Sequence, residues 1–555
     1  MTPRNPVIAL ATHEVTNQPP PLEDYNLFDH DAPLKEALRR EGAAWAEEQA
    51  RTLGALLGSE RVIRLGHDAN RFAPELRTFD RFGHRIDEVE YHPAYHELME
   101  LAFGAGIHSV PWTAPKGGYV VHTALDYLLI QAEAGVCCPI AMTFAAVPVL
   151  RRQPEVAAEW EPRILSTQYD PRCVPAGEKT GVTIGMAMTE KQGGSDVRSN
   201  TTRAVPLGAG GPGEAYELTG HKWFCSAPMS DAFLTLAQTE KGLSCFFVPR
   251  WRPDGSRNAI LIQRLKDKLG NRSNASSEIE FQGTWGRMVG EEGRGVRTIM
   301  DMVHHTRLDT SLAPAGLMRQ AVAQATHHTA HRKAFQALLT RQPLMKNVLA
   351  DLALESEAAT ALVMRVARAF DEGREDSTAR NFARIAIAAT KFWLNKRAPN
   401  HVYEAMECLG GAGYVEESIM PRLYREAPLN SIWEGSGNVI CLDVLRTIER
   451  EPDSVAALLE EISAVRGADR HLDSAVEGLK GLLADRSEPE QRARRLTETM
   501  ALTLQGAILV QHAPAAVADA FCASRLGGEW GHTYGTLPAG TPFDEIIARA
   551  RPVLD

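Results

Sequence analysis

One acidic side chain in this sequence stands where a carboxylate could act as a general base. Glu434 lies between Trp433 and Gly435, in the run Asn430-Ser-Ile-Trp-Glu-Gly-Ser-Gly-Asn438. A neighbouring indole excludes water, and partial desolvation raises the pKa of a carboxylate toward the range in which it accepts a proton from a substrate. The spacing alone fits an ordinary acidic loop residue better, so both interpretations stay open at this point.

Two glycine-rich runs offer bare backbone to a ligand. In the first, Ala187-Met-Thr-Glu-Lys-Gln-Gly-Gly-Ser-Asp196, two glycines permit close approach, while Thr189 and Ser195 supply polar groups. The glycines of the second, Glu407-Cys-Leu-Gly-Gly-Ala-Gly-Tyr414, either end a helix or let a diphosphate lie against the backbone. The first run fits a polar interdomain loop equally well, and the second lacks the Lys-Ser/Thr of a P-loop.

Other kinds of site are not indicated. There is no C-x-x-C pair, no G-x-S-x-G elbow and no H-E-x-x-H helix, and the pair His327 and His331 has no carboxylate in its motif, so no metal site is expected.

The net charge of −10 argues against a dedicated nucleic-acid binder and against attraction to anionic lipid. The longest apolar stretch, residues 135–150, is too short to span a bilayer. Eight cysteines in mostly apolar company and an N-terminus without a secretory apolar region predict a soluble protein of the reducing cytoplasm.

The hydrophobic spacing changes along the 555 residues and predicts the elements that must position these groups. A Pro-rich arm, residues 1–30, is of a kind that is usually disordered or packed on a neighbouring subunit. Helical spacing follows over 31–183, short β-branched and aromatic runs predict an antiparallel sheet or barrel over 184–295, and helical spacing returns over 296–450 and 451–555. The order predicts an α+β fold, mostly α, with segregated layers. Within the second helical region the pattern predicts long helices at 296–317, 319–339, 344–372 and 381–409.

Taken together, the motifs resemble the acyl-CoA dehydrogenase family of flavoproteins. The first glycine-rich run has the family's A-M-T-E-x-x-G-G-S-D form, and the second has its E-x-x-G-G-x-G-Y form. Between them, Gly270-Asn-Arg-Ser273 and Gly290-Glu-Glu-Gly-Arg-Gly295 look like the family's exit from its β-domain. The resemblance covers residues 90–450 in the family's order. It implies an N-terminal helical domain, a central antiparallel β-barrel and a C-terminal four-helix bundle, with FAD as cofactor.

Longer runs narrow this resemblance to the AidB-like group of the family, the flavoproteins of the bacterial response to DNA alkylation. The runs are THEVTNQPPPLEDYNLF, RLKDKLGNRSNAS and PRLYREAPLNSIWEGSGN, together with the additional helical C-terminal domain 451–555. The group implies a cytoplasmic homotetramer that binds double-stranded DNA or deactivates alkylating agents, with weak, isovaleryl-CoA-like dehydrogenase activity. Two alternatives stay open. One is a metabolic FAD-dependent acyl-CoA dehydrogenase or oxidase with no DNA role, and the other is a flavin-stabilised assembly with vestigial activity.

By position, the family resemblance implies several FAD-binding segments. The A-M-T-E run and the H-K-W-F-C-S strand would line the two sides of the flavin, and the segment around Glu434 would wrap the cofactor again. Arg332 and Phe335 resemble a pair that reaches FAD across a subunit boundary, although Gln336 stands where the family usually has Gly. The implied cofactor residues are Met186, Met188, Thr189, Gly194, Ser195, Phe224, Cys225, Ser226, Arg332, Phe335, Gly410, Gly411, Ile432, Trp433, Gly435, Ser436, Asn438 and Leu442.

Glu434 falls on the family's catalytic base. In that chemistry the base removes an α-proton from an acyl thioester while a β-hydrogen leaves as hydride to the flavin. Two departures limit the transfer of activity. Trp433 stands where the family often has a smaller or phenolic side chain and is expected to narrow the acyl pocket, and Ser436 replaces the Thr of E-G-T. The resemblance therefore supports the fold and the cofactor more strongly than acyl-CoA turnover.

The implied DNA binding finds little support in composition. Residues 451–555 hold 10 Lys plus Arg against 16 Asp plus Glu. A solvated helix surface is the plainer explanation of the basic residues in this region. The candidate phosphate contacts are Arg446, Arg492, Arg494 and Arg495.

Overall fold

The computed structural model describes residues 12–554 of the chain. They form two compact units. Unit 1 holds the residues up to Arg64 together with 314–428 and the residues from Cys441 onward, and unit 2 holds 65–313 and 429–440. The units cut across the five segments expected from the sequence, because the short stretch around Glu434 belongs with the sheet although it follows the long helices in the chain.

Unit 2 is built around a closed sheet. In the order β6–β4–β5–β9–β7, each strand pairs with the next, and β7 pairs again with β6. The predicted barrel is confirmed, but it is not wholly antiparallel, since β3 and β4 each pair with β6 in parallel. The strands are β3 (Ile184–Ala187), β4 (Arg203–Pro206), β5 (Ala215–Ser226), β6 (Ala232–Thr239), β7 (Gly242–Pro249), β8 (Ile260–Leu265) and β9 (Ser276–Val289).

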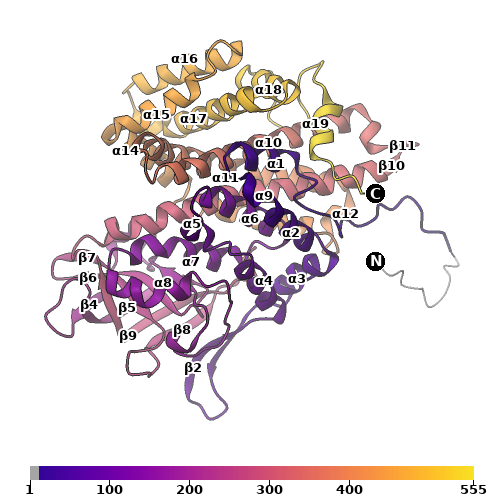
Figure 1. Cartoon of the computed structure of the whole chain (residues 1–555). Coiled ribbons are helices and arrows are strands. Elements are labelled where there is room, and N and C mark those ends of the chain that lie inside the picture. The colour runs from indigo at the N-terminus through magenta and orange to yellow at the C-terminus, as the bar shows by residue number, and fades with distance from the viewer. Residues whose placement is uncertain (1–11, 555) are drawn as a thin grey trace. The chain divides into compact units, whose positions relative to one another are not determined.

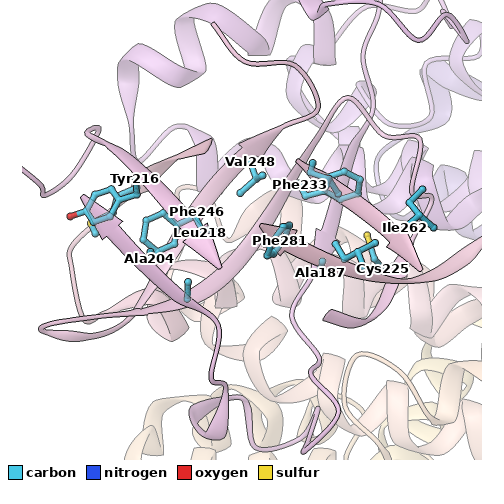
Figure 2. Packing of buried hydrophobic residues seen from close by; sticks show 14 of the residues in the cluster. Ala187, Ala204, Tyr216, Leu218, Cys225, Phe233, Phe246, Val248, Ile262 and Phe281 are labelled. Atoms are coloured by element: carbon cyan, nitrogen blue, oxygen red, sulfur yellow. The ribbon is translucent and has the colours of Figure 1, made fainter. Parts of the chain in front are cut away.

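Inward-pointing side chains of these strands fill the barrel (Figure 2). Phe233, Phe246 and Phe281 are fully or almost fully buried there, and Cys225 lies among the same cluster. Strand β7 is buried on both faces, because Phe246 points into the barrel while the next residue, Phe247, packs edge-on against Trp160 at 4.8 Å. Apolar residues in continuous runs, as in β6 and β7, are what a strand covered on both sides requires.

Helices and one hairpin complete unit 2. The predicted helical region is interrupted by an antiparallel hairpin of β1 (Glu75–Phe79) and β2 (Arg85–Glu90), which the sequence pattern did not reveal. Val89 of this hairpin packs into the barrel core, whereas most of its other side chains are exposed or half-buried. The helices are α4 (Pro93–Gly104), α5 (Val110–Thr113), α6 (Gly118–Ala132), α7 (Cys137–Leu150), α8 (Pro154–Ile164), η2 (Ala176–Glu178), η3 (Val197–Ser199) and η5 (Leu429–Ser431).

Three helices contain residues of both units: α3 (Glu60–Arg71), α9 (Gly295–His331) and α14 (Gly437–Arg450). The prediction of separate helices at 296–317 and 319–339 is wrong. Both stretches belong largely to the single 37-residue α9, because Leu317-Met-Arg319 are all good helix formers and nothing there breaks the helix. The helix ends at His331, before the short hairpin of β10 (Lys333–Ala334) and β11 (Ala337–Leu338).

Unit 1 is helical apart from this hairpin. Helices α10 and α11 are its longest elements within one unit, and α17 and α19 both pack on α10 (Figure 1). The C-terminal region predicted as an additional domain therefore shares its core with the helical bundle. The elements are α1 (Ala32–Arg40), η1 (Ala44–Ala46), α2 (Glu47–Leu57), η4 (Leu339–Arg341), α10 (Pro343–Glu372), α11 (Ser377–Cys408), α12 (Gly411–Tyr414), α13 (Met420–Glu426), α15 (Pro452–Ser463), α16 (Arg470–Ala484), α17 (Pro489–His512), α18 (Ala515–Phe521), the π-helix η6 (Cys522–Leu526) and α19 (Phe543–Ala550).

The described part of the N-terminal arm packs on its own chain. The Tyr25 hydroxyl donates to Gln320 Oε1 at 2.9 Å, and His327 Nε2 contacts the Pro20 carbonyl at 2.9 Å. Residues 1–11 of the predicted arm lie outside the described residues. Across residues 12–554, no helix combines the length and the apolar character that crossing a bilayer requires.

Candidate functional site

The loop that carries Glu434 has an unusual backbone. Glu434 has a φ of +53° and Gly435 a φ of +100°. The φ of Gly435 is one that L side chains rarely adopt, and a Cβ there would also come within 2.8 Å of Ile440 Cδ1, so this position favours glycine. Left-handed backbone at a glutamate costs free energy, and such strain is found preferentially where a side chain must be aimed for function. The backbone therefore favours a functional role for Glu434 over that of an ordinary loop residue.

Helix α9 holds the Glu434 carboxylate. The Thr306 hydroxyl donates to Glu434 Oε2 at 2.9 Å, and Arg307 Nε lies 3.5 Å from the Glu434 carbonyl oxygen. Thr306 and Arg307 are both buried. Trp433, beside the carboxylate, is tied to its own loop, because its indole Nε1 donates to Asn430 Oδ1 at 2.6 Å. Sequence reasoning missed Thr306 and Arg307, since only folding brings them to a residue more than a hundred positions away.

Other predicted segments of unit 2 lie near this loop. Burial raises the pKa of the Cys138 thiol, at the start of α7, to about 12, with a further contribution from the charge of Glu434. The same thiol lies beside Ser226 at the end of β5. The Trp223 backbone N–H, also in β5, donates to the Thr189 carbonyl at 2.7 Å. The loop that carries Glu434 and the C-terminal end of β5 thus have Cys138 as a common neighbour. A backbone hydrogen bond connects β5 with the A-M-T-E run.

A buried ion pair holds the A-M-T-E run in place. Lys222 Nζ donates to Glu190 Oε1 at 2.8 Å and to the Leu236 carbonyl at 2.8 Å, and both charged side chains are completely buried. Glu190 also accepts from the backbone N–H groups of Thr201 and Thr202. Burial opposes ionisation of Glu190, but Lys222 and these hydrogen bonds outweigh it and lower its pKa to about 2. Burial lowers the pKa of Lys222 to about 8, so the pair is charged at neutral pH.

Lys222→Met is expected to lower the free energy of unfolding of unit 2 by about 3–5 kcal/mol, because it leaves the Glu190 carboxylate buried without its cation. The midpoint of urea unfolding measures the effect. Lys191→Met, at an exposed lysine of the same run, is the matched control and is expected to be nearly neutral. Equal effects of the two substitutions would contradict the structural role given to Lys222.

The predicted cofactor residues of unit 2 divide by exposure. Phe224 is 48% exposed and Ile432 65% exposed, so both large apolar side chains are accessible to a ligand. Gly194 and Ser195 are also exposed, and a Cβ on Gly194 would come within 2.8 Å of Thr189 Oγ1. Cys225, by contrast, points into the barrel core (Figure 2), so only its backbone is available on the outer face. Among the other predicted cofactor residues of unit 2, Met186 is buried and Asn438 is exposed. The rest are half-buried: Met188, Thr189, Ser226, Trp433, Gly435 and Ser436.

The predicted cofactor residues of unit 1 lie on its surface. Phe335 is 95% exposed at the tip of the β10–β11 hairpin, and the next residue, Gln336, has a φ of +66°, which explains why glycine would suit that position. Arg332 Nη1 donates to the Asn17 carbonyl at 2.6 Å, and Leu442 is exposed on α14. Gly410 and Gly411 follow the end of α11, and no atom would lie within 4 Å of a Cβ on either. The second glycine-rich run thus both ends a helix and leaves bare backbone exposed.

Three arginines line an open pocket at the start of α9. The pocket, about 570 Å³ in volume, is lined by Arg198, Arg294, Arg297 and Gln238 among others. Arg294 pairs with Glu291 at 3.2 Å, and no acidic residue stands in the first turn of the helix. Arginine side chains together with a helix N-terminus attract anions, phosphate groups in particular. None of these arginines was predicted as a site residue, although Arg294 lies in the Gly290-Glu-Glu-Gly-Arg-Gly295 run.

The DNA-contact candidates, all in unit 1, differ in availability. Arg492 Nη1 is paired with Asp485 Oδ2 at 2.5 Å. Arg494 lies over the Phe392 ring at 5.4 Å but is exposed, and Arg495 is exposed as well. Arg446 is exposed and lies 3.8 Å from Asp443. Burial lowers the pKa of Lys396 on α11, and the positive charge of Arg494 adds to the effect. Lys396 and Arg494 are therefore neighbouring cations, and Glu498 is a further charged neighbour of Arg494.

Comparison with known proteins matches almost the whole chain. Residues 17–171 match the adaptive response protein AidB N-terminal domain, 185–284 the acyl-CoA dehydrogenase middle domain and 293–449 the acyl-CoA dehydrogenase C-terminal domain. AidB of Escherichia coli strain K12 is 48% identical over 92% of this chain and 94% of its own. The crystal structure of Caenorhabditis elegans ACDH-11 in complex with C11-CoA is 26% identical with a TM-score of 0.83, over 94% of both chains. An acyl-CoA dehydrogenase from Bacillus anthracis, complexed with FAD, shares the fold at 16% identity with a TM-score of 0.67, over 96% of this chain and 89% of its own.

Proposed function

This chain belongs to the acyl-CoA dehydrogenase family, in its AidB group, and on that premise we propose that it oxidises an acyl-CoA thioester with Glu434 as the general base. The observation that carries the proposal is the Glu434 loop. Its backbone is held at a left-handed φ of +53°, and the buried Thr306 hydroxyl fixes the carboxylate. A base must be placed precisely against the proton that it removes.

FAD is the cofactor of this family of oxidoreductases, and each unit, taken by itself, has surface residues that suit a part of it. The exposed apolar side chains of Phe224 and Ile432 and the exposed glycine at 194 would hold the flavin within unit 2. Gly410 and Gly411, whose backbone has open space beside it, would admit a phosphate or ribose group. When bound, FAD supplies the acceptor for the hydride that leaves the β-carbon of the substrate.

The side chains of this chain then have distinct tasks. Glu434 removes the α-proton, and Thr306 keeps the accepting carboxylate oriented through the hydrogen bond to Oε2. Trp433, fixed to Asn430, bounds the space beside the base and excludes water from it. Because Glu434 ends the step protonated, it must later release that proton to solvent.

The arginine-lined pocket supports a coenzyme A ester as the substrate class. Coenzyme A carries phosphate groups, and the planar guanidinium groups of Arg198, Arg294 and Arg297 suit phosphate oxygens. The proposal therefore assigns the phosphates of the thioester substrate to these arginines and its acyl thioester to Glu434.

The test of this proposal is anaerobic mixing of the purified FAD-loaded protein with a series of acyl-CoA thioesters of increasing chain length, isovaleryl-CoA included. Loss of the oxidised-flavin absorbance with at least one thioester supports the proposal. Retention of the oxidised spectrum with all of them, at concentrations that saturate binding, would overturn it. The free carboxylic acids are the control, since they lack the phosphates that the arginines bind.

Trp433→Ala is expected to move the preferred acyl chain toward longer or bulkier thioesters, because it removes the large side chain beside the base. The ratio of kcat/KM for a long-chain to a short-chain thioester should rise by about 10-fold or more, the size expected when pocket volume decides specificity. An unchanged ratio would show that Trp433 does not limit the acyl pocket. Tyr414→Ala, at an exposed aromatic residue of unit 1, is the control for the loss of an aromatic side chain.

A second role, nonspecific binding of double-stranded DNA, is proposed for unit 1 on the strength of one observation. Lys396 and Arg494 are cations close enough for Arg494 to contribute to lowering the pKa of Lys396, and a phosphate backbone would contact both of them in competition with Glu498. Arg446 and Arg495 are exposed and would add contacts, whereas Arg492 is engaged with Asp485. Of the roles implied for a protein of the DNA-alkylation response, DNA binding is the one for which these basic side chains provide an argument.

Fluorescence anisotropy with a labelled DNA duplex at two salt concentrations tests the DNA role. The affinity is expected to fall steeply with salt, and Lys396→Ala together with Arg494→Ala should make the slope of log K against log salt shallower by about 2. Arg492→Ala is the control and should leave the slope nearly unchanged. Absence of binding at the lower salt concentration would remove the DNA role and leave the dehydrogenase proposal intact.

The assembly and the compartment are also proposed. We propose a homotetramer, since Phe335 and Leu344 of unit 1 are 95% and 85% exposed and a second copy would cover them. Sedimentation equilibrium of the wild type and of Phe335→Ser tests this.

We also propose that the protein works in the reducing cytoplasm, because all eight cysteines are free thiols.

A further inference from the structure

A buried polar cluster joins α6 to α9 within unit 2. His122 Nε2, on α6, lies 3.0 Å from Asp309 Oδ1, on α9. His122 Nδ1 lies 2.7 Å from the Ile107 carbonyl oxygen. One turn earlier on both helices, the Tyr119 hydroxyl lies 2.9 Å from His305 Nε2. Two polar contacts therefore tie a single turn of α9, residues 305–309, to α6.

The partners of His122 determine where its protons lie. A carbonyl oxygen only accepts, so Nδ1 must carry a proton and donate it to Ile107. A second proton must then lie between His122 Nε2 and Asp309 Oδ1. Without it, the lone pair of Nε2 would face the lone pairs of the carboxylate oxygen, and the two atoms would repel each other. Burial opposes the charged form of His122, but Asp309 and Asp126 outweigh it and raise its pKa. Both residues are buried, and a charge-assisted hydrogen bond in such surroundings is strongly directional.

The turn of α9 at residues 305–309 also contains the residue that contacts the proposed base, Glu434. Thr306, which donates to Glu434 Oε2, lies between His305 and Asp309 in the sequence. A helical turn keeps its own geometry through backbone hydrogen bonds, so anchoring residues 305 and 309 also sets the direction of the side chain at 306.

We propose that His122 and Asp309 are positioning residues for Glu434, acting through α9 and Thr306. The proposal rests on the proposed function of Glu434 as a base and adds to it the pair that orients the base. Neither residue needs to touch the substrate. Their effect is to hold the Thr306 hydroxyl where it fixes the carboxylate.

A third acid in the cluster provides a matched control. Asp126 lies four residues after His122, and both of its carboxyl oxygens are buried with no nitrogen or oxygen hydrogen-bond partner among residues 12–554. Burial and then the charge of Asp309 raise its pKa to about 7, His122 acts in the opposite direction, and the Cys137 thiol of α7 is also adjacent. His108 is a further titratable neighbour of His122. Asp126→Asn removes one titrating group and leaves the pair of His122 with Asp309 intact.

The sign of the pH effect at Asp126 follows from its raised pKa. The folded protein holds this proton more tightly than the unfolded chain, so the stability linked to it is fully present below the unfolded value of 3.8 and falls as the pH rises to about 7. Asp126→Asn should therefore raise Tm, and by more at pH 8 than at pH 5. The rate of flavin reduction should stay at the wild-type value.

The decisive experiment compares Asp309→Ala and Asp309→Asn with the wild type, all loaded with FAD. The rate of flavin reduction at saturating acyl-CoA is measured across the pH range. Asp309→Ala should lower this rate about 10- to 100-fold, as expected for a misplaced base, and shift the acidic limb of the pH profile, with Kd for the thioester nearly unchanged. Asp309→Asn should recover most of the rate, because its amide donates to neutral Nε2. A wild-type rate and pH profile in Asp309→Ala, or no recovery in Asp309→Asn, would overturn the proposal.

A second measurement separates this proposal from the proposed function. If no thioester reduces the wild-type flavin, the proposed function fails, and a pH titration of the flavin spectrum without substrate decides the positioning role. A transition that Glu434→Gln abolishes is assigned to Glu434, and its midpoint should shift in Asp309→Ala. An unchanged midpoint, or no transition sensitive to Glu434→Gln, overturns the positioning role.

Discussion

Glu434→Gln is expected to slow flavin reduction by a bound acyl-CoA about 10³-fold, within the range that a positioned general base contributes. The amide keeps the size of the side chain and can still contact the Thr306 hydroxyl, but it cannot accept the α-proton. Stopped-flow absorbance under anaerobic conditions measures the rate, and the FAD content of the variant shows that the fold and cofactor site are retained.

The control for this substitution is Glu449→Gln, at an exposed carboxylate on α14. It should reduce its flavin at the wild-type rate. If Glu434→Gln also did so with a thioester that the wild type oxidises, Glu434 would not be the base. The loop strain and the hydrogen bond from Thr306 would then have to serve another purpose.

Arg525→Met is expected to lower the free energy of unfolding of unit 1 by about 3–5 kcal/mol, the usual cost of leaving a buried charge without its partner. Arg525 lies in the π-helix η6 and is completely buried. Its Nη2 donates to Asp351 and, at 3.0 Å, to Glu355 Oε2, both on α10. Arg397 of α11 reaches the same Glu355 oxygen at 3.2 Å. The substitution leaves two buried carboxylates with a single arginine.

The midpoint of urea unfolding, followed by circular dichroism, measures this loss. Arg492→Met is the matched control, because its partner Asp485 is on the surface, and it should change the midpoint little. The same network makes unit 1 sensitive to acid. Burial opposes ionisation of Glu355, but Arg397 and Arg525 outweigh it and lower its pKa to about 2, so the stability from this group is present above pH 4.5 and lost as the pH falls toward 2. A midpoint in Arg525→Met equal to that of Arg492→Met would contradict this account.

The network also explains why the C-terminal region does not form a unit of its own. Residues 451–555 were expected to be an additional helical domain, and their helical spacing was read correctly. However, Arg525 lies in a run of mixed apolar and polar residues that gives no sign of a buried partner 174 positions earlier. Charge pairs between distant segments have no local pattern in a sequence, so the sharing of one core by α10 and the C-terminal helices had to come from the structure.

Local patterns predicted the elements more successfully than the contacts between them. The β-branched and aromatic runs placed the sheet within 184–295, where β3 to β9 lie. The helices predicted at 344–372 and 381–409 correspond to α10 and to most of α11. Single strands as short as β3 and β4, with four residues each, carry too little periodicity to be located one by one. The β1–β2 hairpin was missed because only one of its faces packs on the barrel.

In the candidate site, too, the sequence predicted individual residues better than the contacts between them. Family motifs located Glu434 and the A-M-T-E run, but nothing in the sequence connects Glu434 with Thr306, or His122 with Asp309. Strand alternation could have indicated one detail in advance. Phe224 and Ser226 share one face of β5, so Cys225 had to point the other way, into the barrel.

The most direct test of the central claim is identification of the product of a single turnover. The FAD-loaded protein is mixed anaerobically with excess acyl-CoA, quenched, and analysed by mass spectrometry for the enoyl-CoA that has lost one hydrogen from each of the α- and β-carbons. We predict one enoyl-CoA for each flavin reduced in the wild type, and none above background in Glu434→Gln over the same interval. Flavin reduction without enoyl-CoA, or equal enoyl-CoA from both proteins, would contradict dehydrogenation by Glu434.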